Sequence, residues 1–115
     1  MPGAIVVEPS ERILARDVSW ARTGAQRVTG LRGRDDLGAG SALVLEPAKQ
    51  VHTFGMRFPI DVVFCDSSGK VKHVVEQMSP RRVSRVVLTA RYAIEMRGGS
   101  LRGVVKVGDR LRFED

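Results

Sequence analysis

The sequence is poor in the residues on which several protein classes depend. It has a single cysteine, Cys65, so no intramolecular disulfide can form and no multi-cysteine zinc site is available. No run of about 18 apolar residues is present, which excludes a membrane-spanning helix. The apolar run that begins at Ala4 ends at Glu8 and follows no basic region, so it does not form a signal peptide. We therefore expect a cytoplasmic protein without membrane insertion.

Motifs for nucleotide binding and serine hydrolysis are missing as well. Gly38-Ala39-Gly40 lacks the later glycine, the lysine and the following helix of a phosphate-binding loop. No Gly-x-Ser-x-Gly sequence occurs. Cys65 ends an apolar strand sequence, where a buried and inert thiol is the usual outcome, although a thiolate–imidazole pair with His52 is the alternative. We expect no cofactor and no metal.

Positive charge is in excess and is concentrated near the C-terminus. Lys and Arg number 19 against 13 acidic residues, and residues 81–115 contain nine of the basic and four of the acidic groups. Arg81, Arg82 and Arg85 form a candidate anion-binding group that would suit an acidic protein or a nucleic acid. A general compositional bias toward arginine is the favoured explanation of this excess charge, because 15 of the 19 basic residues are Arg. The six aromatic residues also provide no stacking platform interleaved with the basic residues.

Short apolar runs separated by turn residues predict a mainly β domain. A chain of 115 residues suits one domain, residues 1–115, with a single core. We expect a small barrel or sandwich of about seven to nine short strands with one covering α-helix. The expected strands are residues 4–7, 12–18, 42–45, 51–54, 60–65, 70–78, 92–96, 104–107 and 110–113.

Two local patterns give more specific predictions. The turn sequence Asp66-Ser67-Ser68-Gly69 predicts an antiparallel hairpin between residues 60–65 and 70–78. The apolar positions Trp20, Val28 and Leu31 recur at helical spacing. We therefore expect a helix from about Trp20 to Thr29 that packs this face on the sheet.

The densest group of chemically versatile residues lies between Val51 and Asp61. If His52 and Asp61 met across this corner, Asp61 could orient the imidazole as a general base or a metal ligand. One histidine and one acid are too few for a metal site, which usually takes three or four ligands. The favoured interpretation is that Asp61 accepts hydrogen bonds from backbone N–H groups or from Arg57. The candidate ligand or partner site comprises His52, Thr53, Met56, Arg57, Asp61 and Glu95.

Glu95 and His73 are expected in strands and have ordinary interpretations. Glu95 falls on the face opposite Tyr92, Ile94 and Met96, so it is predicted to be solvated or salt-bridged. Glu95 is a functional candidate only if it points at Asp61 or His52, since the pKa of one of two close carboxylates is raised. His73 is predicted to be a half-exposed sheet residue.

Several blocks resemble the family called domain of unknown function 192. They are residues 27–37, 52–66 and 92–99 with Gly108-Asp109, and the match covers about residues 20–113. Its most specific part is Phe54-Gly55-Met56-Arg57-Phe58-Pro59-Ile60-Asp61. Many family members carry a Trp-Met-Lys-Asn-Thr type of sequence there, with a longer insert before the proline, so this chain resembles a shorter branch that bears His-Thr-Phe. The resemblance implies a compact mainly β domain. It points to no particular activity, because none is assigned to the family.

Three functional hypotheses follow from these residues. The first is a non-enzymatic binding module with a ligand or partner site at the corner from His52 to Asp61. The second is a hydrolase-like or metal-dependent enzyme, which requires His52, Asp61 and Glu95 to converge in an open pocket. The third is nucleic-acid binding, which requires the C-terminal arginines on one face: Arg81, Arg82, Arg85, Arg91, Arg97 and Arg102.

Overall fold

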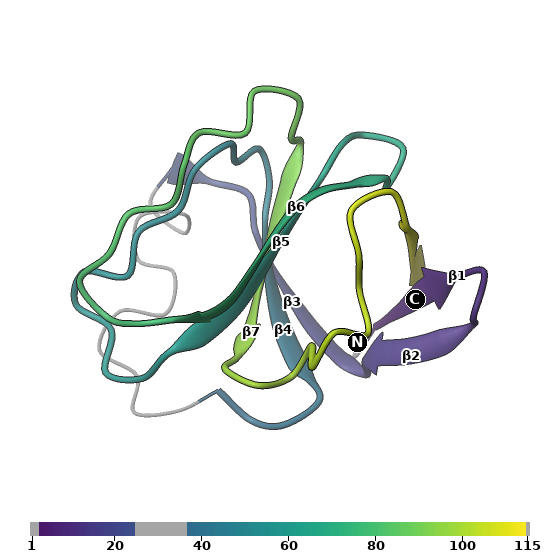
Figure 1. The fold of residues 1–115 in the computed structure, drawn as a ribbon, viewed down its shortest axis with the longest axis horizontal. Coiled ribbons are helices and arrows are strands. Elements are labelled where there is room, and N and C mark those ends of the chain that lie inside the picture. Colours follow the sequence, from purple (N-terminus) through teal and green to yellow (C-terminus); the bar gives the residue numbers. More distant parts are fainter. Residues whose placement is uncertain (1–2, 25–36, 115) are drawn as a thin grey trace.

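The computed structural model describes residues 3–24 and 37–114 and is mainly β (Figure 1). It contains eight strands, a number within the predicted range. They are β1 (Ala4–Glu8), β2 (Arg12–Ala15), β3 (Asp17–Ala21), β4 (Ser41–Leu45), β5 (Ile60–Cys65), β6 (Val71–Met78), β7 (Tyr92–Arg97) and β8 (Arg110–Glu114).

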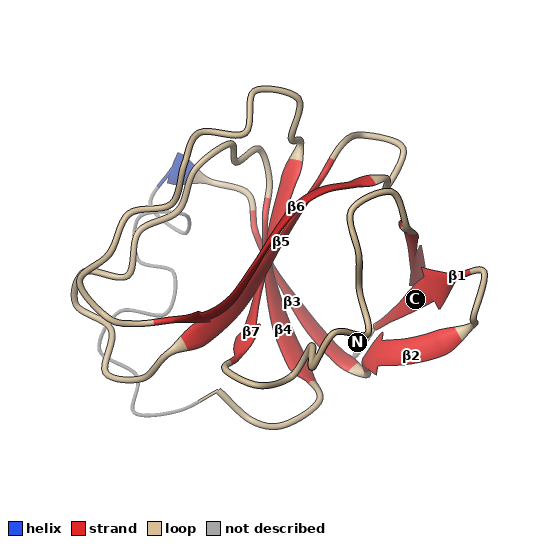
Figure 2. Cartoon of the chain, viewed as in Figure 1, coloured by secondary structure: helices blue, strands red, loops and turns tan. Residues whose placement is uncertain are grey.

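The strands form two sheets that define the layers of the molecule. One sheet has the order β2-β1-β8, and the other has the order β3-β4-β7-β5-β6. Neighbouring strands are antiparallel except for β3 and β4. The three-stranded sheet lies on one side of the five-stranded sheet, and long loops lie on the other side (Figure 2). The five-stranded sheet is therefore a middle layer.

Both faces of the five-stranded sheet are covered by apolar side chains. Val63 and Cys65 belong to a core between the two sheets, which we call the intersheet core. Val62 and Phe64 point the other way, into a second core beneath the loops, which we call the loop-side core. Burial on both faces explains why β5 is almost continuously apolar in sequence.

The predicted β5–β6 hairpin is confirmed. The strands pair antiparallel, and Asp66 Oδ1 accepts hydrogen bonds from the amides of Ser68 (2.9 Å) and Lys70 (3.0 Å). Gly69 has φ +89°, and a Cβ at this position would collide with the carbonyl oxygen of Leu111 at the start of β8. The turn thus also joins the two sheets, since the Leu111 amide donates to the Gly69 carbonyl at 2.8 Å.

The predicted helix does not begin at Trp20. Trp20 and Ala21 belong to β3, which pairs with β4, and the Trp20 ring packs against Tyr92 and Phe113. Val18 and Trp20 face the intersheet core, so the local period is two and not 3.6. The remainder of the predicted helical face, Val28 and Leu31, lies outside the described residues.

Three predicted strands differ from the observed ones. Residues 12–18 divide at Arg16 into β2 and β3, which enter different sheets, and the amides of Arg16 and Asp17 both donate to the Gly40 carbonyl. Residues 51–54 form only an isolated bridge between His52 and Val83. Residues 104–107 form no strand, because β8 pairs with the distant β1 instead of with this neighbouring segment.

Candidate functional site

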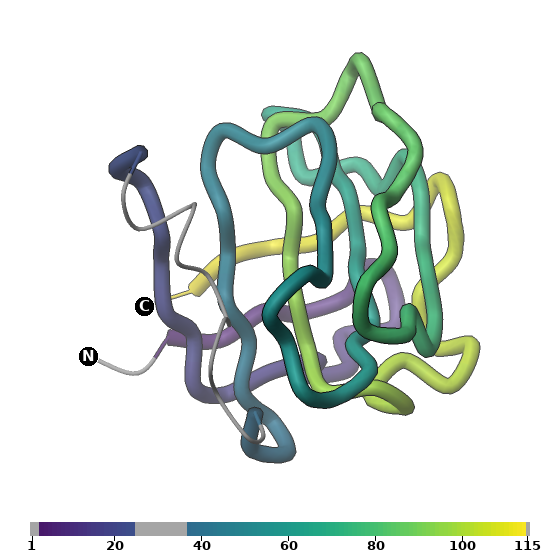
Figure 3. The backbone as a smooth tube through the Cα atoms, turned by 90° about the vertical axis from the view of Figure 1, so that its left-hand side faces the viewer, coloured from purple at the N-terminus to yellow at the C-terminus, as the bar shows by residue number. Residues whose placement is uncertain are grey.

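Residues 48–54 and 81–91 run antiparallel beside each other and cover the loop-side core (Figure 3). Backbone amides of Val87, Ser84 and Thr53 donate to the carbonyls of Lys49 (2.7 Å), Val51 (2.9 Å) and Arg82 (2.9 Å). We call this pair of segments the loop ribbon. Its hydrogen bonds are too irregular to make strands, yet they hold two loops that lie about 30 residues apart in sequence.

Thr53 fastens one end of the loop ribbon. Its side chain is fully buried, and Oγ1 donates to the Ser79 carbonyl at 2.7 Å while accepting from the Arg82 amide at 2.8 Å. Its carbonyl accepts from the amide of Arg81, a residue with φ +65°. A non-glycine residue is strained in this conformation. Thr53 therefore fixes the direction of the chain that bears Arg81 and Arg82.

The loop ribbon has a buried inner face and an exposed outer face. Val51, Thr53, Ser84 and Val87 are buried. The residues between them are exposed, namely His52, Phe54, Val83, Arg85, Val86 and Leu88. The centroids of the His52 and Phe54 rings lie 5.7 Å apart, and His52 Nδ1 accepts a hydrogen bond from the Phe54 amide at 3.2 Å. The predicted site residue His52 is thus part of the outer surface.

The predicted anion-binding arginines lie on the same loop ribbon. Arg81, Arg82 and Arg85 are exposed, and within residues 3–24 and 37–114 none of them forms an ion pair. Arg91 at the end of the same segment contrasts with them, because it binds Glu46 at 3.3 Å. The structure therefore brings this arginine group next to His52, which lies about 30 residues earlier in the sequence.

Asp61 lies on β5, away from the loop ribbon, and its carboxylate is hydrogen-bonded to backbone amides. Its buried carboxylate accepts hydrogen bonds from the amides of Gln77 (2.8 Å), Gly99 (3.1 Å) and Leu101 (2.8 Å). Gln77 has φ +54° at an irregularity in the β5–β6 pairing, and this conformation turns its amide toward Asp61. Asp61 therefore ties β5 to the end of β6 and to the turn after β7, in agreement with the favoured structural interpretation.

Glu95 is buried, so the prediction of a solvated or salt-bridged acid is wrong. Its side chain is 3% exposed and faces the loop-side core from the central strand β7. Burial raises the pKa of Glu95 to about 7, because the charged form loses its hydration. The sequence showed one apolar face of this strand and could not show that loops also cover the other. His73, in contrast, is half-buried in β6, as predicted, and its ring stacks on Phe64.

The predicted candidates are not brought together in one pocket. His52 lies on the outer surface, Asp61 faces the intersheet side, and Glu95 faces the loop-side core. Met56 is buried in the loop-side core, whereas Arg57 is exposed. The described ranges contain no group of three His, Cys, Asp or Glu side chains that could hold a metal ion.

Cys65 is not an activated nucleophile. It is fully buried at the end of β5. Desolvation, with a smaller contribution from the charge of Asp66, raises the pKa of its thiol to about 12. Since the thiolate is the reactive form, this cysteine is inert at neutral pH.

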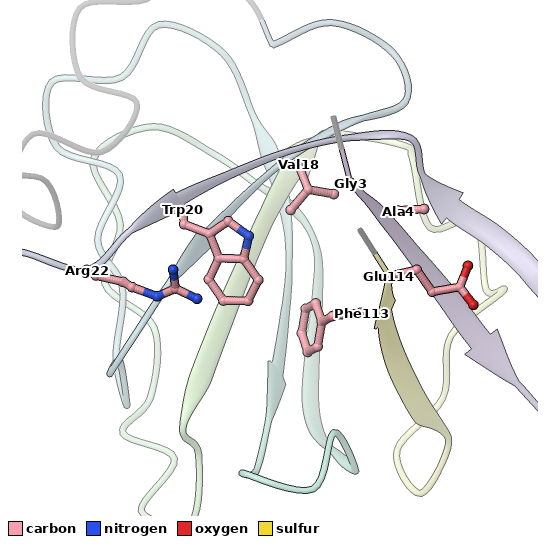
Figure 4. Close-up of a pocket in the computed structure, with 7 residues that line it drawn as sticks. All are labelled: Gly3, Ala4, Val18, Trp20, Arg22, Phe113 and Glu114. Carbon is pink, nitrogen blue, oxygen red and sulfur yellow. The ribbon is translucent and has the colours of Figure 1, made fainter. Parts of the chain in front are cut away.

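A separate pocket of about 290 Å³ lies between β3 and the outer ends of β1 and β8 (Figure 4). The centroids of the Trp20 and Phe113 rings lie 5.3 Å apart there, and the Arg22 guanidinium lies 4.1 Å from the centre of the indole. Sequence reasoning missed this pocket because it placed Trp20 on a helix. Its lining residues are Gly3, Ala4, Val18, Trp20, Arg22, Phe113 and Glu114.

The relationship to known proteins is clear at the level of family and fold. The family model DUF192, described as uncharacterized ACR, matches residues 5–113. The chain belongs to the DUF192 family. Comparison with curated proteins finds no significant match. The described part of this DUF192 chain contains no helix long and apolar enough to cross a membrane.

Two solved structures share the fold of the DUF192 chain. A protein of unknown function from Novosphingobium aromaticivorans has a TM-score of 0.82 at 21% identity, with 97% of this chain and 84% of that chain covered. A protein from Sinorhizobium meliloti described as a "putative transcription regulator" has a TM-score of 0.78 at 23% identity, with 96% and 91% covered. At these identities the likeness establishes the fold alone.

Proposed function

We propose that this DUF192 domain is a non-enzymatic binding module that takes an acidic, partly apolar protein segment on the outer face of the loop ribbon. One observation carries the proposal. Four of the six large apolar side chains that are exposed in the described residues lie on the loop ribbon, beside three arginines without ion pairs. The four are Phe54, Val83, Val86 and Leu88, and Leu88 is 78% exposed.

This combination of side chains is typical of protein interfaces. Clustered apolar residues on a surface are costly to hydrate and often mark a contact with another protein. Aromatic residues and arginine are enriched in such contacts, where they contribute much of the binding free energy. The hydrogen bonds that hold the loop ribbon reduce the ordering cost of binding. Unpaired arginines favour carboxylates in the partner.

The proposal retains part of the sequence-predicted corner and merges it with the arginine group. His52 contributes to the outer face, and Thr53 holds the segment that bears Arg81 and Arg82. Asp61 supports the fold behind this surface and does not contact the partner. The enzyme hypothesis loses its geometric basis, because His52, Asp61 and Glu95 face three different regions.

Nucleic-acid binding is the competing function for the same surface. The arginines and the His52–Phe54 ring pair would suit single-stranded nucleic acid, and the Sinorhizobium meliloti protein is described as a "putative transcription regulator". The exposed aliphatic side chains favour a protein partner, since Val86 and Leu88 have no stacking surface for bases. The two functions differ in which substitutions abolish binding.

A random peptide display library tests the proposed partner chemistry. We expect the protein to enrich peptides that combine Asp or Glu with Leu, Ile or Phe, and the best enriched peptide then serves as the probe. Val86→Ser and Leu88→Ser should each weaken binding of this peptide by about tenfold, which corresponds to about 1.4 kcal/mol. Ile13→Ser is the matched control, because Ile13 on β2 is 46% exposed and Val86 is 49% exposed.

Two outcomes would overturn the proposal. In the first, the library gives no enrichment of acidic residues over the unselected pool. In the second, single-stranded oligonucleotides bind with steep salt dependence, and Val86→Ser and Leu88→Ser leave that binding unchanged while Arg82→Ala weakens it. The second result would assign the surface to nucleic acid.

A further inference from the structure

Glu95 occupies the centre of the face that the loop ribbon covers. It lies on β7, the middle strand of the five-stranded sheet, and its register partners are Leu43 on β4 and Val62 on β5. Val62 is in turn paired with Val75 on β6. The carboxyl therefore stands in a cross-strand row of otherwise apolar side chains, directed at the layer between the sheet and the loop ribbon.

The described neighbours of Glu95 on this face of the sheet are apolar. Val51, Met56, Phe58 and Val87 cover this face from the loops, and no hydrogen-bond donor to the Glu95 carboxyl occurs within residues 3–24 and 37–114. The charged or titratable groups of the adjoining elements are exposed or separated from it. They are Arg97 on β7, Asp61 on β5, Lys72, His73 and Glu76 on β6, Asp17 on β3, Lys49, His52 and Arg57 in the first loop, and Arg81, Arg82 and Arg85 in the second.

An unpaired carboxylate is not stable in such a layer. A protonated carboxyl can be buried there at moderate cost, whereas the ionised form must regain water or a cation. In the described residues, the middle of the loop ribbon meets the sheet through apolar side chains. Its backbone hydrogen bonds run within the loop ribbon, and at its ends Thr53 binds the Ser79 carbonyl and the Arg91 amide binds the Cys65 carbonyl. The middle is therefore the part that can separate from the sheet and admit water.

We propose that Glu95 is a proton-controlled latch, which keeps the loop ribbon packed on the sheet when protonated and loosens it when ionised. The partner surface is thus intact in the protonated form and weakened in the ionised form. This regulation rests on the proposed function, because the outer face of the loop ribbon is the surface that would be lost.

The pKa of Glu95 places the transition near neutral pH. Burial raises this pKa to about 7, well above the usual 4.5 of a glutamic acid, and burial is the cause because no charged group of the described residues contributes. Since the folded-state value is raised, the packed form is favoured at low pH and is lost as the pH rises through 7. The latch therefore responds to pH between about 4.5 and about 7, and it is fully loosened above this range.

Hydrogen exchange of the backbone amides tests the latch without any partner. The amides of Ser84 and Val87 report on the loop ribbon between its fastened ends, and the amide of Val71, which donates to the Asp109 carbonyl, reports on the rest of the fold. After correction for intrinsic exchange, protection of the loop ribbon should fall about tenfold between about pH 5 and about pH 6 and level off above about pH 7, while protection of Val71 stays constant. Glu95→Gln and Glu95→Met should abolish this change, and Glu76→Gln, an exposed acid on β6, should preserve it.

The outcomes separate the latch from the proposed function. Unchanged protection of the loop ribbon in the parent protein overturns the latch, and so does an equal loss in Glu95→Gln or an equal loss at Val71. The affinity for the selected acidic peptide should also fall with rising pH in the parent protein but not in Glu95→Gln. Failure of every peptide to bind while the exchange result holds would overturn the proposed function and leave the pH-dependent loosening established.

Discussion

Asp61 on β5 and Glu95 on β7 are diagonal neighbours in one sheet, and their carboxyls face opposite sides of it. Asp61 pairs with Met96, while Glu95 pairs with Val62. The Asp61 carboxylate accepts hydrogen bonds from three backbone amides, whereas the Glu95 carboxyl lies among apolar side chains. Two acids of similar burial thus have different roles, one in holding the fold and one in responding to pH.

Asp61→Asn should destabilise the protein by about 3 kcal/mol. The amide keeps the shape of the side chain but directs a donor at the backbone donors of Gln77, Gly99 and Leu101. Urea unfolding measures the loss. Asp17→Asn is the control, since the exposed Asp17 has a single long contact with Ser41. Equal stability of the Asp61 variant and the parent would show that these hydrogen bonds do not hold the fold.

Glu95→Gln should remove a pH dependence of stability. With the pKa of Glu95 raised from 4.5 to about 7 in the folded state, its contribution to stability is fully present below 4.5 and is lost as the pH rises through 7. The parent should therefore lose about 3 kcal/mol of unfolding free energy across this range through this group. Denaturant unfolding at several pH values measures the slope. A slope of the same size in the glutamine variant would refute the assignment to Glu95.

Gly69→Ala should be more destabilising than Gly103→Ala. Both glycines have positive φ, so both substitutions introduce backbone strain of about 1 kcal/mol. Only at Gly69 would the new Cβ collide with the Leu111 carbonyl, whereas no atom lies within 4 Å of a Cβ at Gly103. We expect an additional loss of about 2 kcal/mol at Gly69. Thermal unfolding of the two variants checks the difference, and equal melting temperatures would count against the close approach of the hairpin turn to β8.

Thr53→Val should loosen the loop ribbon. The substitution keeps the volume of the side chain but leaves the Ser79 carbonyl and the Arg82 amide without their buried partner, at a cost of about 2 kcal/mol. Binding of the selected acidic peptide should weaken as well, because Arg81 and Arg82 lose their fixed direction. Thr89→Val, at an exposed position of the same segment, should leave stability and binding within error. If the Thr53 variant binds as the parent does, Thr53 has no part in positioning the surface.

Local sequence signals predicted the elements that local interactions determine. The turn from Asp66 to Gly69 and the apolar runs on both sides of it specify the β5–β6 hairpin. The structural role of Asp61 was favoured in the sequence because one histidine and one acid are too few for a metal site. The hairpin contacts can be inferred from residues near one another in the sequence, whereas the amides that Asp61 binds lie 16 to 40 residues away.

The remaining features depend on contacts between distant segments. Trp20 entered a strand because β4, more than 20 residues later, supplies a parallel partner. Glu95 is buried because loops cover a face that alternation alone marks as polar. The arginines at 81–85 meet His52 only through the loop ribbon, whose hydrogen bonds follow no repeating pattern. Hydrophobic periodicity carries no information about such pairings.

A charge exchange across the proposed interface is the most direct test of the binding function. The triple variant Arg81→Glu, Arg82→Glu and Arg85→Glu is measured against the selected acidic peptide and against the same peptide with its acids replaced by lysine. We predict that the parent binds only the acidic peptide and that the triple variant binds only the lysine peptide, each by fluorescence anisotropy at low salt. Binding of the acidic peptide with unchanged affinity by the triple variant would contradict the proposed surface.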